Sequence, residues 1–151
     1  MCTAQLRAFL SVDDAKWLSP SAMGRNGQVW RRNVDHARAT IASAAAVGDV
    51  SISDMQASKQ RKLCRIGLSP TLQKLKSQAG AFYLVNETGN MVQQLNCHQM
   101  GLLQGWSRNA SDDILTHLTP RQYRAALGNG ICRPVLLGLV QCLLESQGWI
   151  R

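Results

Sequence analysis

The run AFYLVNETGNMVQQLNCHQMGLLQG, residues 81–105, contains the clearest local signals in the chain. Five apolar residues at 81–85 predict a buried strand. The turn-forming residues at 86–90 allow the chain to return as a second strand at 91–95. Asn96 is a good N-cap for a helix that Gly105 would end. We therefore expect an antiparallel hairpin followed by a helix in the middle of the chain.

Helical signals flank this hairpin on both sides. Before it, apolar residues recur at helical spacing across 28–46, while 47–54 reads as a loop or a short strand. The segment 55–65 is polar and basic and has no clear period. After the hairpin, residues 112–117 are expected to add a turn or two of helix. The predicted fold class is α+β, mostly helical, with one small antiparallel sheet or hairpin.

Two further helix starts are found near the C-terminus. Thr119 is an N-cap residue followed by Pro120 at the first helical position, and this helix would end at the Gly-Asn-Gly of 128–130. Pro134 opens a final helix that Gly148 would end. Because that helix is apolar on nearly all sides, its composition is typical of a buried helix.

The length and composition of the chain allow a packed domain. Its 151 residues suit one domain or part of a larger protein, and a hydrophobic share of 45% is sufficient for a core. No apolar run approaches the roughly 20 residues of a membrane span. The first residues lack the apolar centre of a signal peptide. We therefore expect a soluble intracellular protein, in the cytoplasm or the nucleus, with no membrane partner.

Positive charge is concentrated in residues 21–76. Ten basic residues stand against three acidic ones there, so this segment holds +7 of the formal net charge of +8. Such clustering suits a polyanion, because each phosphate that a cation neutralises releases condensed counterions. A solvated basic surface without a partner explains the same charge equally well.

The cysteines and histidines form no recognisable metal-binding or catalytic pattern. The five cysteines, an odd number without a Cys-x-x-Cys pair, argue against a disulfide framework and a zinc finger. Cys97 and His98 are adjacent, but no second pair lies at a suitable spacing, so we expect no metal. His36, His98 and His117 are isolated, and each suits a surface or core position better than catalysis.

Six short segments in the second half of the chain carry a more specific pattern. They are 70–72 (PTL), 95–96 (LN), 103–106 (LQGW), 123–124 (YR), 128–131 (GNGI) and 134–135 (PV). In this order they resemble the C-terminal part of the cytosine-5 DNA methyltransferases. That family's ninth motif runs Arg-x-Leu-Thr-x-x-Glu and Arg-Leu-Gln-Gly-Phe-Pro. Its tenth motif runs Tyr-(Arg/Lys)-x-x-Gly-Asn-(Ser/Ala)-Val-x-x-Pro-Val and leads into an apolar helix.

The chain departs from the family at several positions and lacks its catalytic motifs. The ninth motif's Arg, Thr, Glu, Arg and Pro are replaced by Gln93, Asn96, Gln99, Leu102 and Ser107. None of the cysteines follows a proline, as the family's nucleophile does, and the Glu-Asn-Val and Phe-x-Gly-x-Gly segments are missing. Methyl transfer needs a thiolate, an acid near the base and a cofactor loop. We therefore expect no catalytic residue and no activity of this chain alone.

The resemblance implies a role for each part of the chain. Residues 1–68 would correspond to the basic target-recognition region, and 69–151 to the ninth and tenth motifs, which belong to the family's small domain and final helix. Asn129 would lie at the edge of a pocket for S-adenosylmethionine whose main walls belong to the missing catalytic domain, so this chain alone should bind no cofactor. The residues expected to contact DNA are Arg31, Arg32, Lys59, Arg61, Lys62, Lys74, Lys76, Gln104 and Gly105.

The expected function is that of a DNA-recognition fragment or subunit of a cytosine-5 DNA methyltransferase. Its partners would be double-stranded DNA and a chain that carries the catalytic domain, or a second copy bound through the last helix. In the family that helix packs on the catalytic domain, so its leucines would be exposed in this chain alone. Three alternatives remain. They are a basic nucleic-acid-binding module unrelated to methyltransferases, a small enzyme of another class, and a structural fragment that interacts through the last helix.

Overall fold

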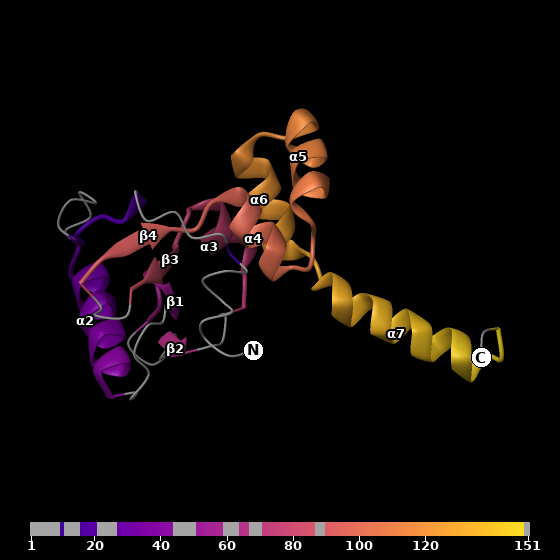
Figure 1. Ribbon diagram of the computed structural model, residues 1–151, viewed down its shortest axis with the longest axis horizontal. Coiled ribbons are helices and arrows are strands. Elements are labelled where there is room, and N and C mark those ends of the chain that lie inside the picture. Colours follow the sequence, from indigo (N-terminus) through magenta and orange to yellow (C-terminus); the bar gives the residue numbers. More distant parts are fainter. Residues whose placement is uncertain are drawn as a thin grey trace.

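A small antiparallel sheet with helices on both faces forms the body of the protein (Figure 1). The computed structural model describes residues 10, 16–20, 27–43, 51–58, 64–66, 71–86 and 90–149, with the backbone alone at 64–66 and 78. The strands within these residues are β1 (Ser51–Asp54), β2 (Cys64–Ile66), β3 (Phe82–Val85) and β4 (Val92–Gln94). The helices are α2 (Gln28–Ser43), α3 (Lys74–Gln78), α4 (Cys97–Leu103), α5 (Arg108–His117), α6 (Pro120–Asn129) and α7 (Arg133–Ser146). The predicted α+β class with one small antiparallel sheet is confirmed.

The predicted hairpin lies inside a four-stranded sheet with the order β2-β1-β3-β4. β3 pairs with β4 between Tyr83–Gln94 and Val85–Val92, and its other edge pairs with β1. The structure makes 51–54 a strand, which the sequence left open. β2 was not predicted, because Cys64 and Arg65 lie in the polar segment 55–65 and Ile66 lies directly after it. These residues pair with β1 only in the tertiary structure.

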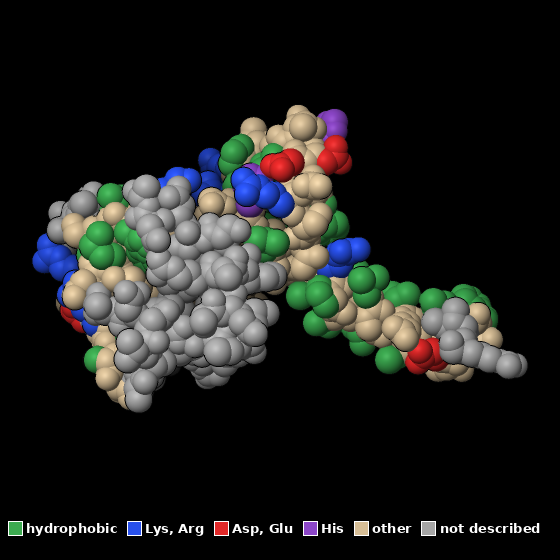
Figure 2. Space-filling view, in the orientation of Figure 1, with side chains coloured by type: hydrophobic (Ala, Val, Ile, Leu, Met, Phe, Trp, Pro, Cys, Tyr) green, Lys and Arg blue, Asp and Glu red, His purple; other side chains and the backbone are tan. Residues whose placement is uncertain are grey.

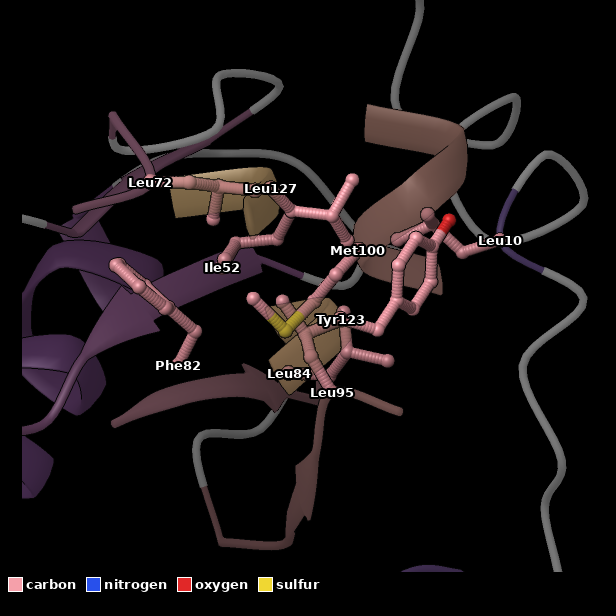
Figure 3. Packing of buried hydrophobic residues seen from close by; sticks show 9 residues of the cluster. All are labelled: Leu10, Ile52, Leu72, Phe82, Leu84, Leu95, Met100, Tyr123 and Leu127. Atoms are coloured by element: carbon pink, nitrogen blue, oxygen red, sulfur yellow. The ribbon is translucent and has the colours of Figure 1, made fainter. Parts of the chain in front are cut away.

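Alternate residues of the central strands point to opposite faces of the sheet, and each face has its own core. The first core, against α4 and α6, contains Leu10, Ile52, Leu72, Phe82, Leu84, Leu95, Met100, Tyr123 and Leu127 (Figure 3). The second core, against α2, contains Trp30, Val34, Ala37, Ile41, Met55, Tyr83, Val85 and Val92. Each large apolar side chain buried in this way contributes about 1.5–3 kcal/mol. The sheet is therefore held from both faces.

The helices that follow the sheet begin where capping residues allow. Asn96 starts α4 and Thr119 starts α6, as predicted, and each forms a capping box with the glutamine three residues later. α5 begins earlier than the predicted 112–117, because the Ser107 side chain accepts a hydrogen bond from the Ala110 N–H at 3.2 Å. The capping serine therefore adds a full turn to this helix.

α7 begins and ends close to the predicted residues, but it does not pack against the rest of the protein. None of its residues is buried, and the exposed fractions of Val140 and Leu143 are 43% and 63%. Figures 1 and 2 show it projecting away from the body with a largely hydrophobic surface. The prediction of a buried helix is therefore wrong for this chain. Its composition calls for burial, but the described residues provide no surface that covers it. The exposure of its leucines that the resemblance implied is confirmed.

Candidate functional site

Three of the six short segments named above, 103–106, 128–131 and 134–135, come together at the base of α7. We call this meeting point the motif junction and define it as residues 72–74, 103–106 and 127–134. The Gln104 side-chain amide donates a hydrogen bond to the Leu127 carbonyl oxygen at 3.0 Å, and the Arg133 N–H donates to the Gln104 carbonyl oxygen at 2.9 Å. Gln104, at the end of α4, is therefore hydrogen-bonded both to the last turn of α6 and to the first residue of α7.

Gly105 lies directly under the first turn of α7. Its φ is +83°, and a Cβ built there would lie 2.9 Å from Pro134 Cγ and closer still to Pro134 Cδ. A glycine therefore suits position 105 for both its backbone conformation and its lack of a side chain. Beside it, the Arg133 guanidinium lies over the Trp106 ring, 5.8 Å from its centroid, which adds a cation–π contact to the same joint.

Gly128 brings α6 against the start of α3. A Cβ at this position would lie 2.6 Å from the Gln73 carbonyl carbon and 2.7 Å from the Lys74 nitrogen. The backbones of α6 and α3 therefore approach as closely as only glycine permits. This contact brings the segment after Pro70-Thr71-Leu72 into the motif junction.

An apolar groove continues from the motif junction along α5 and α6. Its volume is about 170 Å³. Ile131, 61% exposed, forms part of its wall at the foot of α7. The lining residues are Gln104, Trp106, Ile114, Leu118, Tyr123, Ala126, Leu127, Gly130 and Ile131.

The structure separates the basic residues that were expected to contact DNA. Arg31 is exposed on α2 and Lys74 is exposed on α3. Because α2 packs on one face of the sheet and α3 lies with the helices of the other, these two cations cannot belong to one flat patch. Lys59, Arg61 and Lys62 lie outside the described residues.

Lys76 and Arg32 are engaged in internal contacts. The Lys76 ammonium forms an ion pair with the Asp54 carboxylate, whose side chain is 2% exposed, so its charge balances a buried anion. The Arg32 guanidinium donates to the Asn33 side-chain oxygen at 3.0 Å and to the Ala57 carbonyl oxygen. Both cations hold the turn that follows β1, one from each side of the sheet.

Two other residues expected at the site occupy contrasting environments. Gln104 is 8% exposed, and its amide nitrogen already has a partner within the protein. Asn129 is exposed at the last turn of α6 and does not line the apolar groove beside it.

Among the described residues, the groups with possible chemistry are the Cys97 thiol and the His98–Asp112 pair. Burial raises the pKa of the Cys97 thiol, against a smaller lowering by Arg124, and the thiol donates to the Pro120 carbonyl oxygen at 3.6 Å. A thiol of raised pKa stays protonated at neutral pH, and the thiolate is the reactive form. His98, isolated in the sequence, lies 2.6 Å from an Asp112 carboxylate oxygen. In the described part of the chain, no group of three metal-binding side chains comes together.

Comparisons with protein-family models, with curated proteins and with solved structures found no match for this chain. Among the described helices, none is both long enough and apolar enough to cross a membrane by itself. α6 and α7 reach that length and composition only when counted together, across a bend of 42°. Part of α6 is buried, since Tyr123 and Leu127 belong to the first core.

Proposed function

We propose that this chain is the DNA-recognition part of a cytosine-5 DNA methyltransferase and acts with a catalytic domain that binds S-adenosylmethionine. The observation that carries the proposal is the motif junction. The segments 103–106 and 134–135, which resemble parts of the ninth and tenth motifs, contact each other there through Gly105 and Pro134, and Gly128 packs on Gln73 and Lys74, just after the Pro-Thr-Leu segment.

The second support is the arrangement of α7. The motif junction anchors only the first turn of this helix, through Arg133 and Pro134, and leaves the rest exposed. Burying one leucine is worth about 1.5–3 kcal/mol, so a surface of this size favours an interface. The proposed occupant is the catalytic domain, which would cover Leu136, Leu137, Leu139, Val140, Leu143 and Leu144.

The residues present in this chain indicate which steps it would perform and which the catalytic domain would perform. The basic part of the chain would contact phosphates, and α7 would hold the complex together. The thiolate nucleophile and the cofactor loop would come from the catalytic domain, since methyl transfer to cytosine requires both. Asn129, exposed beside the motif junction, is accessible to a partner.

Reconstitution tests the proposal directly. The chain would be mixed with a family catalytic domain that ends before its target-recognition region, and transfer of a labelled methyl group to duplex DNA would be measured. We expect no transfer by either piece and transfer by the mixture. If the chain binds DNA but neither associates with the catalytic domain nor restores transfer, it is a nucleic-acid-binding module of another kind.

The salt dependence of DNA binding tests the recognition role separately. The logarithm of the association constant should fall with the logarithm of salt concentration with a slope of about −3 or steeper. Alanine at Lys59, Arg61 and Lys62 together should flatten it. Arg31 and Lys74 lie on opposite faces of the sheet, so Arg31→Ala and Lys74→Ala should have different effects on this slope. Only the substitution on the face that binds DNA should make the slope shallower, by about 0.9. Absence of binding at about 50 mM salt would rule out the recognition role.

A further inference from the structure

The free end of α7 presents a tryptophan in a defined position. Gly148, with a φ of +70°, ends the helix, and its N–H donates to the Glu145 carbonyl oxygen at 3.0 Å. The Trp149 N–H donates to the Leu144 carbonyl oxygen at 2.9 Å. Together these bonds form a Schellman motif, which fixes the residue after the glycine at the end of the helix. The Trp149 side chain is nevertheless 76% exposed, and tryptophan is among the residues that contribute most to protein interfaces.

The apolar groove at the other end of α7 suits an aromatic ring. Its volume of about 170 Å³ is close to that of an engineered apolar cavity of about 150 Å³ that binds benzene. Gln104 lines the groove, and its Oε1 is buried without a hydrogen-bond partner among the described residues. A buried acceptor without a partner is costly, and the indole of tryptophan carries a single N–H donor. The groove therefore fits an apolar ring that brings one donor to Gln104.

Trp149 cannot reach the groove of its own chain. α7 has 14 residues and is therefore about 21 Å long. The groove lies at the foot of this helix, where Ile131 forms part of its wall, and Trp149 lies beyond the far end. Figure 1 shows α7 extending straight away from the body between these two points. A Trp149 side chain that fills this groove must therefore come from a second copy.

The charges of α7 favour an antiparallel pair of helices. Between residues 133 and 149 the charged side chains are Arg133 in the first turn and Glu145 in the last. Figure 2 shows positive charge where α7 leaves the body, negative charge near its far end and hydrophobic side chains between. A parallel pair would bring like charges and like ends of the helix dipoles together. An antiparallel pair places each Glu145 near the partner's Arg133 and each Trp149 near the partner's groove.

We propose that two copies of this chain associate through antiparallel α7 helices, with Trp149 of each copy in the apolar groove of the other. The indole N–H donates to Gln104 Oε1, and the leucines of the two helices cover one another. The assembly is closed, because two-fold symmetry makes each contact occur twice. This dimer goes beyond the proposed function and excludes the complex with a catalytic domain, since both cover the same surface of α7.

Sedimentation equilibrium of the full chain tests the pairing. We expect a dimer, and Trp149→Ala should raise its dissociation constant at least about tenfold, because each dimer loses two buried rings. Trp149→Phe keeps the ring without the donor and should have a smaller effect. Leu75→Ala is the matched control, because Leu75 is also 76% exposed but lies on α3 and does not line the groove. It should leave the dissociation constant unchanged, and circular dichroism melting curves would verify that each variant folds.

Crosslinking tests the antiparallel arrangement. A carbodiimide joins an ammonium to a carboxylate only when the two groups are in contact, so Arg133→Lys makes position 133 reactive towards Glu145. Within one chain these positions are about 18 Å apart along α7, so a link between them must join two copies. Mass spectrometry of mixed unlabelled and nitrogen-15-labelled chains would identify it. We expect this link in Arg133→Lys and its loss when Glu145→Gln is added.

Three results would overturn the proposal. A chain that stays monomeric, including one that binds a catalytic domain as a monomer, would leave the surface of α7 to that domain. Equal effects of Trp149→Ala and Leu75→Ala on the dissociation constant would remove the tryptophan from the interface. A dimer of Arg133→Lys without the link between positions 133 and 145 would contradict the antiparallel pairing.

Discussion

Gly105 and Pro134 lie so close together that no side chain fits between them. A Cβ at position 105 would lie 2.9 Å from Pro134 Cγ and closer to Cδ, and the φ of +83° is strained for other residues. We expect Gly105→Ala to lower the free energy of unfolding by about 1–3 kcal/mol from the backbone conformation alone, with the overlap adding to it. Urea denaturation would measure the loss.

Gly138→Ala is the matched control for that substitution. Gly138 lies inside α7 with nothing within 4 Å of a built Cβ. Alanine in a helix interior is favoured over glycine by about 0.5–1 kcal/mol, so this change should leave stability unchanged or raise it. Equal losses from both substitutions would contradict the close contact between Gly105 and Pro134.

The Asp54–Lys76 pair gives a prediction that separates stability from DNA binding. Lys76→Met would leave the buried Asp54 carboxylate without its counterion, and we expect a loss of roughly 3 kcal/mol in the free energy of unfolding. Lys74→Met, at an exposed position on the same helix, should change it by less than about 0.5 kcal/mol. Chemical denaturation of both variants measures the difference. A stable Lys76→Met variant with weakened DNA binding would instead assign Lys76 to phosphate contact.

The exposed surface of α7 predicts self-association of the isolated chain. Leu137→Glu with Leu144→Glu should make the chain more soluble and monomeric and abolish its binding to the catalytic domain. Stability should change little, since Leu137 is 54% exposed and neither residue is buried. Sedimentation and binding measurements would test this.

Ser146→Glu with Gln147→Glu adds the same charge at the exposed, polar end of α7 and serves as the control. It should leave self-association and partner binding intact. If both double variants behave alike, net charge rather than the leucine surface governs association.

Burial of Cys97 gives a pH dependence of stability. Its pKa is raised above the ordinary 9.0 by desolvation, which outweighs the lowering by Arg124. Above about pH 9 the unfolded thiol loses its proton while the folded thiol keeps it, so the free energy of unfolding falls as pH rises. Cys97→Ser should flatten this decline in urea titrations between about pH 8 and 10.

The contribution of Tyr123 and a control variant complete the test of Cys97. The pKa of Tyr123 is also raised from its ordinary 10.0, mainly by burial, so part of the decline above about pH 10 should persist in Cys97→Ser. Cys142→Ser, at an exposed position, controls for the loss of a thiol as such. An unchanged slope in Cys97→Ser would contradict the effect of burial on this thiol.

Local sequence signals predicted the strand and the helix starts that depend only on residues close together in the sequence. The apolar run 81–85 forms β3 within one residue of its expected limits. Asn96 and Thr119 start helices, because a side-chain oxygen can reach backbone N–H groups only a few residues away. Ser107 carries the same local capping signal at the start of α5.

The candidate site was only partly predictable. The sequence pointed to Gln104, Gly105 and 128–131, but not to the contacts that bring them together. The pairing of Lys76 with Asp54, 22 residues apart, requires α3 to come against the end of β1. Sequence separation of this kind leaves no local signal.

The sequence by itself determined the α+β class, the central hairpin and the helix starts, because side-chain alternation and capping act over a few residues. The tertiary structure alone decided the order β2-β1-β3-β4, the inward orientation of Gln104 and the exposed position of α7. Apolar composition determines how much free energy a helix gains when its surface is buried, but the surface that covers it must come from other elements. For α7, the described residues of this chain supply only the joint at Gly105 and Pro134 from which it projects.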